Sequence, residues 1–266
     1  MLKIITLLTD FGLRDGYHGV LKGVIWGILP DAQIADISHE IAHQDVFEGA
    51  QVLARSAFFF PPGTVHVGVV DPGVGTQRRP IALRLGEYTF VGPDNGLFTR
   101  VLEKAESQGW PVEYVHLNRP RYWLPEVCNV FHGRDIFAPV AAHLASGVPL
   151  RDLGSPISDP VRLDIPRPAR TPQGWSGRVV WVDIFGNLTT NLSKNDLAGS
   201  TVEKICIGGK EIYGTVRAFG DRAPGELVAL IDSNDQLSVC MVGGSAARLL
   251  GGTIGMELQV VAARRG

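Results

Sequence analysis

Two kinds of apolar pattern alternate along the first 150 residues, and this alternation constrains the fold more than any other feature of the sequence. Short, continuous apolar runs are typical of buried strands, and the segments between them have the periodicity of amphipathic helices. Strands separated by helices favour a mainly parallel sheet covered on both faces, which is an α/β sandwich. The predicted strands are 3–8, 33–37, 65–70, 80–85, 88–91 and 112–117, and the predicted helices are 16–29, 45–58, 95–107 and 135–147.

A proline-rich segment ends this alternation. Five of the 17 prolines fall between residues 156 and 172, where neither periodicity is present, so this segment is predicted to be an extended linker. Beyond it, short strand-like runs separated by glycines and Asn-Asp turns predict a smaller all-β barrel. We expect an α/β domain at 1–157, a linker at 158–174 and a C-terminal β-barrel domain at 175–266. The strand-like runs of the barrel are 177–182, 202–207, 226–231, 236–241 and 255–262.

Composition favours a small molecule as the binding partner. The 266 residues carry a formal net charge of −2, and no run of Lys or Arg is longer than two residues, so no nucleic-acid surface is predicted. No apolar stretch approaches the roughly 18 residues of a membrane span, and Lys3 and Asp10 interrupt the apolar start too soon for a signal peptide. We therefore predict a cytoplasmic protein that does not bind membranes. Cys128, Cys206 and Cys240 lack C-x-x-C spacing and predict neither disulfides nor a cysteine zinc site.

The segment His39-Glu40-Ile41-Ala42-His43 matches the H-E-x-x-H pattern of zinc metalloproteases. Such a zinc site needs both histidines on one helix, so that both imidazoles face the same ion. The apolar stripe of the next helix, however, begins after Asp45, which together with Glu48 resembles a capping box. His39 and His43 are thus predicted to lie in a loop upstream of the helix. We expect the match to be a coincidence, with no metal bound.

Compact polar motifs follow several of the predicted strands. TDFG (9–12) follows the first strand, DPGVG (71–75) the third and GPDNG (92–96) the fifth. Ligands of open α/β sheets bind beyond the carboxyl ends of the strands, so these loops are predicted to share one site with the SHEI loop that follows the second strand. Two further motifs are FHGRD (131–135) and VDIFGNLTTN (182–191). Each motif by itself is also compatible with ordinary turn chemistry.

Together and in this order, the five motifs resemble those of the S-adenosylmethionine hydrolase family, also called hydroxide adenosyltransferases, whose relatives include fluorinase and chlorinase enzymes. The resemblance extends from TDFG to an NSxGxL-like segment at 232–237, DSNDQL. It implies an N-terminal α/β domain, a C-terminal β-barrel and a homotrimer, with the substrate bound between the N-terminal domain of one subunit and the C-terminal domain of its neighbour. The implied reaction is attack of water on the 5′ carbon of S-adenosylmethionine. This attack releases adenosine and L-methionine and needs no metal or other cofactor.

The resemblance implies that an Asp-Arg-His triad acts on the attacking water, and its motif positions correspond to Asp71, Arg78 and His132. The sulfonium leaves as a neutral thioether and needs no general acid, whereas water must be positioned and must lose a proton. Asp71 is the expected proton acceptor, Arg78 would keep that carboxylate ionised and oriented, and His132 would complete the hydrogen bonds. Arg79 is the next residue, so the choice between the two arginines stays open.

The resemblance also implies residues that bind the ribose and the methionine ammonium. Asp10 corresponds to a carboxylate that accepts both ribose hydroxyls, and Gln44 corresponds to a position that faces the substrate in the halogenases. Asp183 corresponds to the partner of the methionine ammonium.

The remaining residues implied by the resemblance would bind adenine and the methionine carboxylate. Phe185 and Phe219 would stack on the two faces of adenine, with core packing as the alternative for both, and Asn187 would bind the edge of the base. Ser233 would bind the carboxylate. Asn234 replaces the Arg that follows this Ser in the halogenases, so this part of the site departs from their pattern.

Two other functions are compatible with the same pocket. A halogenase needs an apolar halide site, and the halogenases of the family have Tyr at the position of Asp71 and Ser at that of Gly133. An anionic Asp71 would repel a halide, so we predict water as the nucleophile. A protein that binds S-adenosylmethionine or adenosine without turnover is the second alternative. The intact set of Asp71, Arg78 and His132 favours an enzyme.

Overall fold

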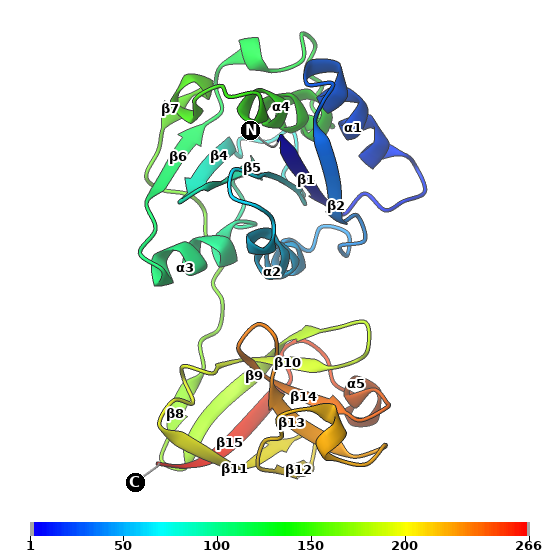
Figure 1. Ribbon diagram of the computed structural model, residues 1–266, viewed down its shortest axis with the longest axis vertical. Helices are drawn as coiled ribbons and strands as arrows, with labels where there is room; N and C mark the ends of the chain where they lie inside the picture. Colours follow the sequence, from blue (N-terminus) through cyan, green and yellow to red (C-terminus); the bar gives the residue numbers. More distant parts are fainter. Residues whose placement is uncertain (1–2, 265–266) are drawn as a thin grey trace. The chain divides into compact units, whose positions relative to one another are not determined.

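The computed structural model describes residues 3–264, and the chain divides into two units, Met1–Leu163 and Asp164–Gly266 (Figure 1). The division falls inside the segment 158–174, which the sequence predicts to be a linker. The first part of this segment is attached to the N-terminal unit, where Asp94 Oδ1 accepts a hydrogen bond from Val161 N at 2.7 Å.

Seven strands form the sheet of the N-terminal unit, in the order β2-β1-β3-β5-β4-β6-β7. β2, β1, β3 and β5 are parallel, whereas β4, β6 and β7 run antiparallel to their neighbours. The α/β class is confirmed, and the sheet is mixed because the two-residue turn Gly86-Glu87 joins β4 and β5 into an antiparallel hairpin. The strands are β1 Ile4–Thr9, β2 Gln33–Ser38, β3 Val65–Val69, β4 Pro80–Leu85, β5 Tyr88–Pro93, β6 Val112–His116 and β7 Ser155–Pro156.

Helices cover both faces of this sheet (Figure 1). α1 and α4 contact each other on one face, and α2 and α3 contact each other on the other. β1 contributes to both cores, since Ile5 and Leu7 share a core with Leu21 of α1, and Leu8 shares a core with Leu53 of α2. Successive side chains of a strand point to opposite faces of the sheet, so a strand buried on both faces contributes its side chains alternately to the two cores. The helices are α1 Tyr17–Ile28, α2 Val46–Ser56, α3 Thr99–Ser107 and α4 Ala138–Ala145, with shorter turns η1 Ala57–Phe59, η2 Pro120–Tyr122, η4 Leu150–Leu153 and the π-helical turn η3 Gly133–Phe137.

The C-terminal unit is an antiparallel sheet of eight strands that curls into a nearly closed barrel, as the sequence predicts (Figure 1). Its order is β12-β11-β15-β9-β10-β14-β13, and β8 pairs with β9. The two ends of the sheet meet just after β12, where Val216 N donates to Ala229 O of β13 at 2.8 Å. The strands are β8 Ala169–Thr171, β9 Gly174–Val182, β10 Leu188–Ser193, β11 Ser200–Ile207, β12 Lys210–Tyr213, β13 Leu227–Ile231, β14 Gln236–Met241 and β15 Glu257–Arg264, with the short helices η5 Phe219–Asp221 and α5 Ala246–Leu250.

Five elements of this unit are missing from the sequence prediction: β8, β10, β12, η5 and α5, of which β8 falls within the segment 158–174. β10 has the polar sequence LTTNLS, yet Thr189 and Thr190 are 3% and 0% exposed. Thr189 Oγ1 is satisfied in the interior by Ser238 Oγ at 3.1 Å. This burial depends on a partner 49 residues away, so the local pattern of apolar residues does not indicate it.

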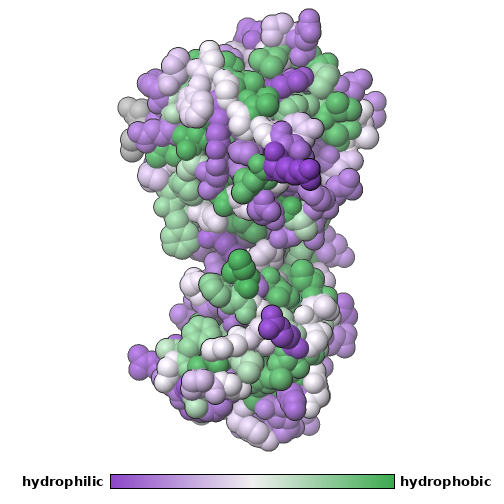
Figure 2. All heavy atoms as spheres, turned by 90° about the vertical axis from the view of Figure 1, so that its right-hand side faces the viewer, coloured by the Kyte–Doolittle hydropathy of each residue, from purple (hydrophilic) through white to green (hydrophobic). Residues whose placement is uncertain are grey.

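The surface of the protein carries hydrophobic residues interspersed with hydrophilic ones, as the face in Figure 2 shows. Among the most exposed large apolar side chains are Ile184 at 95% and Phe185 at 74%, in the turn between β9 and β10. Across residues 3–264, no helix is long and apolar enough to cross a membrane.

Candidate active site

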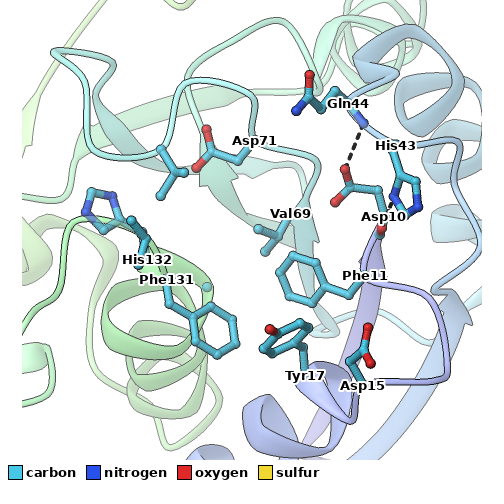
Figure 3. Close-up of a pocket in the computed structure, with 13 residues that line it drawn as sticks. Asp10, Phe11, Asp15, Tyr17, His43, Gln44, Val69, Asp71, Phe131 and His132 are labelled. Carbon is cyan, nitrogen blue, oxygen red and sulfur yellow. Dashed lines mark hydrogen bonds between the residues drawn. The ribbon is translucent and has the colours of Figure 1, made fainter.

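A cavity of about 330 Å³ opens at the carboxyl ends of β1 and β3 in the N-terminal unit (Figure 3). Because these strands are parallel neighbours, the residues that follow them, Asp10 and Asp71, reach the same edge of the sheet. Gln44, from the loop after β2, and His132, just before η3, also line the cavity. The loops TDFG, DPGVG and FHGRD therefore meet the 39–44 loop at one site.

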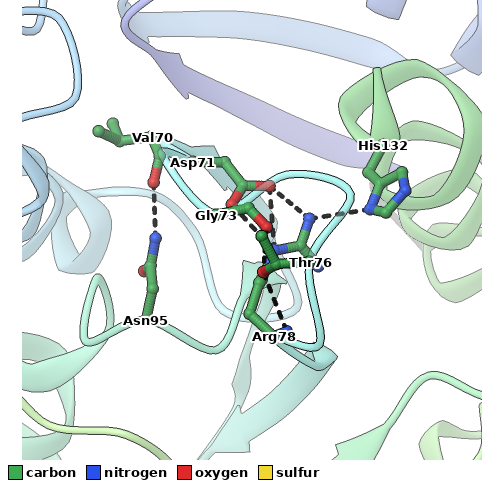
Figure 4. Close-up of polar contacts among 7 residues, drawn as sticks. All are labelled: Val70, Asp71, Gly73, Thr76, Arg78, Asn95 and His132. Atoms are coloured by element: carbon green, nitrogen blue, oxygen red, sulfur yellow. Dashed lines mark hydrogen bonds and ion pairs between the residues drawn. The ribbon is translucent and has the colours of Figure 1, made fainter. Parts of the chain in front are cut away.

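The GPDNG motif supports this site and does not line it. Asn95 Nδ2 donates to Val70 O at 2.8 Å, and Asn95 Oδ1 accepts from Leu97 N at 3.2 Å. The side chain thus holds the backbone immediately before Asp71 (Figure 4).

Asp71, Arg78 and His132 form one hydrogen-bonded cluster (Figure 4). Arg78 Nε donates to Asp71 Oδ1 at 2.9 Å, Arg78 Nη2 donates to Asp71 Oδ2, and the same Nη2 is 3.0 Å from His132 Nδ1. The side chains of Asp71 and Arg78 are only 6% and 9% exposed, so water screens the ion pair weakly. The two bonds from one guanidinium fix the orientation of the carboxylate.

The contact with Arg78 defines the protonation of His132. A guanidinium can only donate, so His132 Nδ1 accepts, and the proton of the neutral ring is on Nε2. Burial lowers the pKa of His132 below its usual value, and the charge of Arg78 lowers this pKa further. His132 is therefore a neutral donor at its Nε2 atom.

A glycine shapes the loop that carries this cluster. Gly75 has φ +77°, and a Cβ at this position would lie 2.3 Å from Asn129 O. Only glycine adopts this conformation so close to another backbone segment. The second glycine of DPGVG thus lets the loop pack against the segment before His132.

Arg79 makes an entirely different set of contacts. Arg79 Nε donates to the buried Asp94 at 2.8 Å, and its Nη1 and Nη2 atoms donate to the side chain and the carbonyl of Asp159 at 2.9 and 2.7 Å. Arg79 is therefore not a solvated surface charge, because its side chain ties the segment after β7 to the sheet. Of the two neighbouring arginines, Arg78 is the one that contacts Asp71 and His132.

Asp10 is held at the other side of the cavity by the 39–44 loop (Figure 3). Gln44 N donates to Asp10 Oδ2 at 2.8 Å, and His43 Nδ1 is 3.0 Å from Asp10 O. Gln44 has φ +64°, which is unusual for a residue with a side chain. This strained backbone directs its N–H at the carboxylate.

The H-E-x-x-H segment is not helical. α2 begins at Val46, and Asp45 caps it by accepting from Glu48 N at 2.8 Å, which confirms the predicted helix start. The Glu48 carboxylate reaches Ala42 N at 3.0 Å instead of Asp45 N, so the capping box is incomplete. His39 and His43 lie in the loop, and within residues 3–264 no three His, Cys, Asp or Glu side chains are arranged to hold a metal ion.

The candidate residues of the C-terminal unit begin with Asp183, which organises the turn between β9 and β10. Asp183 Oδ1 accepts from Phe185 N at 2.9 Å and from Asn187 N at 2.8 Å, and Oδ2 accepts from Asn187 Nδ2 at 2.8 Å. The carboxylate and the amide to which the family resemblance assigns substrate binding thus contact each other in this structure. As a consequence, the turn presents Phe185 outward.

Phe185, Phe219 and Ser233 lie on three different loops of the barrel. Phe185 is 74% and Phe219 is 44% exposed, so core packing is wrong for both aromatic residues. Ser233 is exposed in the turn between β13 and β14. Thr189 Oγ1, near the start of β10, is 3.3 Å from Asp232 Oδ2, so the turn that carries Ser233 is adjacent to the strand that follows Asn187.

Sequence reasoning missed part of the cavity lining. Asp15 adds a third carboxylate beside Asp10 and Asp71. Phe11, Tyr17 and Phe131 form an aromatic wall, with ring centroids 5.4 to 6.1 Å apart and edge-to-face geometry. Asp15 could have been found from its position five residues after Asp10, but the aromatic residues come from separate segments whose contact the sequence does not indicate.

The fold and the cavity define a two-unit protein, α/β followed by a β-barrel, whose polar site centres on an Asp-Arg-His cluster. The family model of the SAM hydroxide adenosyltransferase N-terminal domain matches residues 5–154, and that of the C-terminal domain matches residues 177–259. The chain belongs to the SAM hydroxide adenosyltransferase family.

Individual relatives cover nearly the whole chain. The chain is 42% identical over 264 residues to the (R)-S-adenosyl-L-methionine hydrolase of Salinispora tropica, covering 97% of both chains. It is 32% identical over 221 residues to a fluorinase of an Actinoplanes species, covering 73% of each. Among solved structures, an uncharacterized conserved protein from Thermotoga maritima superposes with a TM-score of 0.88 at 37% identity, over 97% of this chain and 99% of that one. The similarity to the hydrolase is thus higher and longer than that to the fluorinase.

Proposed function

We propose that this protein is an S-adenosyl-L-methionine hydrolase in which water attacks the 5′ carbon and releases adenosine and L-methionine. The observation that carries the proposal is the Asp71 carboxylate, oriented by Arg78 at the wall of the cavity. The relative from Salinispora tropica, named (R)-S-adenosyl-L-methionine hydrolase, supports it over 97% of the chain. No cofactor takes part in the proposed reaction.

The cluster suits the demands of this displacement. The sulfonium departs as a neutral thioether, so the rate depends on positioning the water and accepting its proton. Asp71 accepts the proton, and Arg78 keeps the carboxylate in one orientation. His132, neutral with its proton on Nε2, donates a hydrogen bond that orients the water.

Charge in the cavity favours a cationic substrate over a halide. Asp10, Asp15 and Asp71 all line it, and their negative charges attract a sulfonium and an ammonium group. The same charges raise the cost of placing fluoride or chloride next to the 5′ carbon. The shorter and weaker match to the fluorinase agrees with this preference.

We assign the remaining parts of the substrate as the family resemblance implies. Asp10 accepts the ribose hydroxyls and Gln44 faces the substrate. The exposed Phe185 and Phe219 stack on adenine and Asn187 binds its edge, whereas Asp183 and Ser233 bind the amino-acid end. A homotrimer, in which the C-terminal unit of one subunit completes the cavity of its neighbour, gives these exposed aromatic residues an apolar ligand to cover. The cytoplasmic location stays a prediction from the sequence.

The configuration at sulfur is part of the proposal. In the name (R)-S-adenosyl-L-methionine hydrolase the L prefix fixes the α-carbon, so (R) describes the sulfonium. We propose that this protein also acts on the (R) sulfonium epimer.

One experiment tests substrate, bond and nucleophile together. The protein is incubated with each sulfonium epimer in ¹⁸O-labelled water, and the products are analysed by chromatography and mass spectrometry. We expect methionine and adenosine with the label in the 5′ hydroxyl, from the (R) epimer and in the presence of a chelator. A 5′-halo product in fluoride or chloride buffer would instead indicate a halogenase. Tight binding of the (R) epimer without products would indicate a binding protein.

A further inference from the structure

The H-E-x-x-H segment takes part in a run of polar contacts beside the cavity. Thr9 Oγ1 is 2.8 Å from His39 Nδ1, and His39 Nε2 is 3.1 Å from Asp36 Oδ1. Lys22 Nζ of α1 reaches the other oxygen of Asp36 at 2.6 Å. Thr9 and His39 are 0% and 3% exposed, so this end of the run is shielded from water, whereas the Asp36 side chain is 38% exposed. It connects α1, β2 and the end of β1.

The chemistry of the partners indicates which atoms carry the protons in these contacts. Burial acts to raise the pKa of Asp36, but the hydrogen bond from Lys22 and the contact with His39 outweigh it and hold the pKa below its usual value. Burial lowers the pKa of His39 despite the adjacent carboxylate, so the ring is neutral. His39 Nε2 lies 3.1 Å from Asp36 Oδ1 but is not aligned for a hydrogen bond, so its contact with Asp36 is electrostatic. The nearby carboxylate favours the tautomer with the proton on Nε2, and Nδ1 then accepts from the Thr9 hydroxyl. Thr9 Oγ1 in turn accepts from Phe11 N at 3.2 Å.

The loop held in this way contacts Asp10 through His43 and Gln44 (Figure 3). Gly12 N donates to His39 O at 2.7 Å, His43 Nδ1 contacts Asp10 O, and Gln44 N donates to Asp10 Oδ2. Across residues 3–264, Gln44 N is the one donor to the Asp10 carboxylate. The loop must be fixed to keep Gln44 in its left-handed conformation, so the place of the loop determines the orientation of Asp10.

We propose that Thr9, His39 and Asp36 form a polar chain, with a hydrogen bond between Thr9 and His39 and an electrostatic contact between His39 and Asp36, that positions Asp10 for the 2′,3′-diol of a nucleoside. The three are positioning residues, because they act through Asp10 and do not touch the ligand. The inference rests on the proposed function, which assigns the ribose to Asp10. A carboxylate that turns away from its place keeps at most one of two hydrogen bonds to the diol, which corresponds to a loss of about tenfold in affinity.

Three variants of β1 separate positioning from simple stability. Thr9→Val removes the hydroxyl from the chain at nearly constant volume, and Thr9→Ser restores it. Thr6→Val is the matched control, since Thr6 Oγ1 is 2.7 Å from His66 Nδ1 and both residues are 0% exposed. Thr6→Val thus removes the same kind of Thr–His bond from the same strand, away from the cavity lining.

Calorimetry measures the affinity of each variant for adenosine and for 2′,3′-dideoxyadenosine, which lacks the diol. We expect Thr9→Val to reduce the preference for adenosine about tenfold, and Thr9→Ser and Thr6→Val to retain it within about twofold. With S-adenosylmethionine, the KM of Thr9→Val is expected to rise about tenfold while kcat changes less than about twofold. Equal weakening of both nucleosides by Thr9→Val, or the same loss of preference in Thr6→Val, would overturn the proposal.

A second variant covers the case in which Thr9→Val does not fold. The Asp36 side chain is 38% exposed, so Asp36→Asn disturbs packing less, and it weakens the electrostatic contact with His39 by removing the charge. We expect Asp36→Asn to reduce the preference for adenosine, as Thr9→Val does. An unchanged preference would overturn the proposed positioning role. If the wild-type protein neither prefers adenosine over 2′,3′-dideoxyadenosine nor turns over S-adenosylmethionine, the proposed function itself is wrong. This outcome differs from a failure of the positioning chain, in which the wild type shows both properties and the variants retain the preference.

Discussion

Asp71 has its two carboxylate oxygens bound by a single guanidinium, and this arrangement decides what the residue can do. The bonds from Arg78 occupy one side of the carboxylate and leave lone pairs that face the cavity. A nucleophilic water there has an acceptor whose direction does not change during the reaction. Two substitutions separate the charge of Asp71 from the geometry that Arg78 imposes.

Asp71→Asn preserves the size of the side chain and removes the proton acceptor. We expect kcat for methionine release to fall by roughly 100-fold or more, because general-base catalysis contributes about that factor. The affinity for adenosine, measured by calorimetry, should stay within about threefold because Asp10 and its loop are untouched. Methionine release at the wild-type rate would show that another group accepts the proton.

Arg78→Lys is expected to lower kcat at least about tenfold, since an ammonium cannot bind both Asp71 oxygens and His132 at once. Arg79→Lys is the matched control in the adjacent residue. It should leave kcat within about twofold and lower the melting temperature, because it weakens the contacts with Asp94 and Asp159. If both variants lose kcat to the same extent, the assignment of Arg78 is wrong.

At the scale of elements, β1 shows how buried polar pairs fix one strand against its neighbours. Thr6 and Thr9 are both fully buried and each is bonded to a histidine, one in β3 and one after β2. His66 packs its ring 4.9 Å from that of Phe90, and burial lowers the pKa of His66 to about 3. A neutral histidine inside a sheet has a consequence for stability.

The free energy of unfolding should fall on acidification because of His66. Between pH 6.5 and 3 the unfolded chain binds a proton that the folded chain does not, so this contribution is complete above pH 6.5 and is lost as the pH falls. From pH 7 to pH 5 the loss due to His66 is about 2 kcal/mol. Urea denaturation of wild type and His66→Leu at both pH values measures it. The wild type should lose about 2 kcal/mol more than the variant, and equal losses would show that His66 is not neutral in the fold.

Two features that the sequence did not predict, the strand β10 and the pairing of β4 with β5, have physical reasons. Strands such as β1 and β3 are apolar on both faces, so their burial is visible locally, and the start of α2 after Asp45 is visible from its cap. β10 is buried through hydrogen bonds of Thr189 to distant residues, and the pairing of β4 with β5 depends on a turn between them. Local patterns indicate burial by apolar side chains, and not burial that requires a remote polar partner.

The candidate site, like the fold, could be predicted only in part from the sequence. Motifs indicated which loops carry polar residues, and the order of parallel strands brought Asp10 and Asp71 to one edge. The proton position of His132 and the neighbour of each arginine depend on contacts up to 80 residues apart, and spacing alone could not supply them.

At the scale of the whole molecule, the candidate residues fall into two groups, one in each unit. Asp10, Asp71 and His132 belong to the first, and Asp183 and Phe185 belong to the second. Both groups are needed if the proposed homotrimer forms its sites between subunits. The arrangement can be tested without knowing the geometry of the assembly.

Asp71→Asn and Asp183→Ala chains are each expected to be inactive by themselves. Coexpressed, they should regain activity, because an intact N-terminal unit of one chain meets an intact C-terminal unit of the other. With random mixing of equal amounts, about one site in four combines an intact N-terminal unit with an intact C-terminal unit, so about one quarter of the wild-type activity is expected. Sites built within one chain would give no recovery, and light scattering on the same sample should report the mass of three subunits.

The opposite contacts of Arg78 and Arg79 turn the length of the DPGVG loop into a constraint on how the protein can evolve. Successive side chains of an extended segment point to opposite sides, so one residue gained or lost between Gly75 and Arg78 would exchange the two arginines. The arginine that now ties down the segment after β7 would face Asp71, and its neighbour would face solvent or Asp94. Substitutions at Gln77 do not change the side to which Arg78 and Arg79 each point. During evolution this loop should therefore accept substitutions more readily than changes of length. Insertions or deletions should be retained only where a second change restores the number of residues between Gly75 and Arg78.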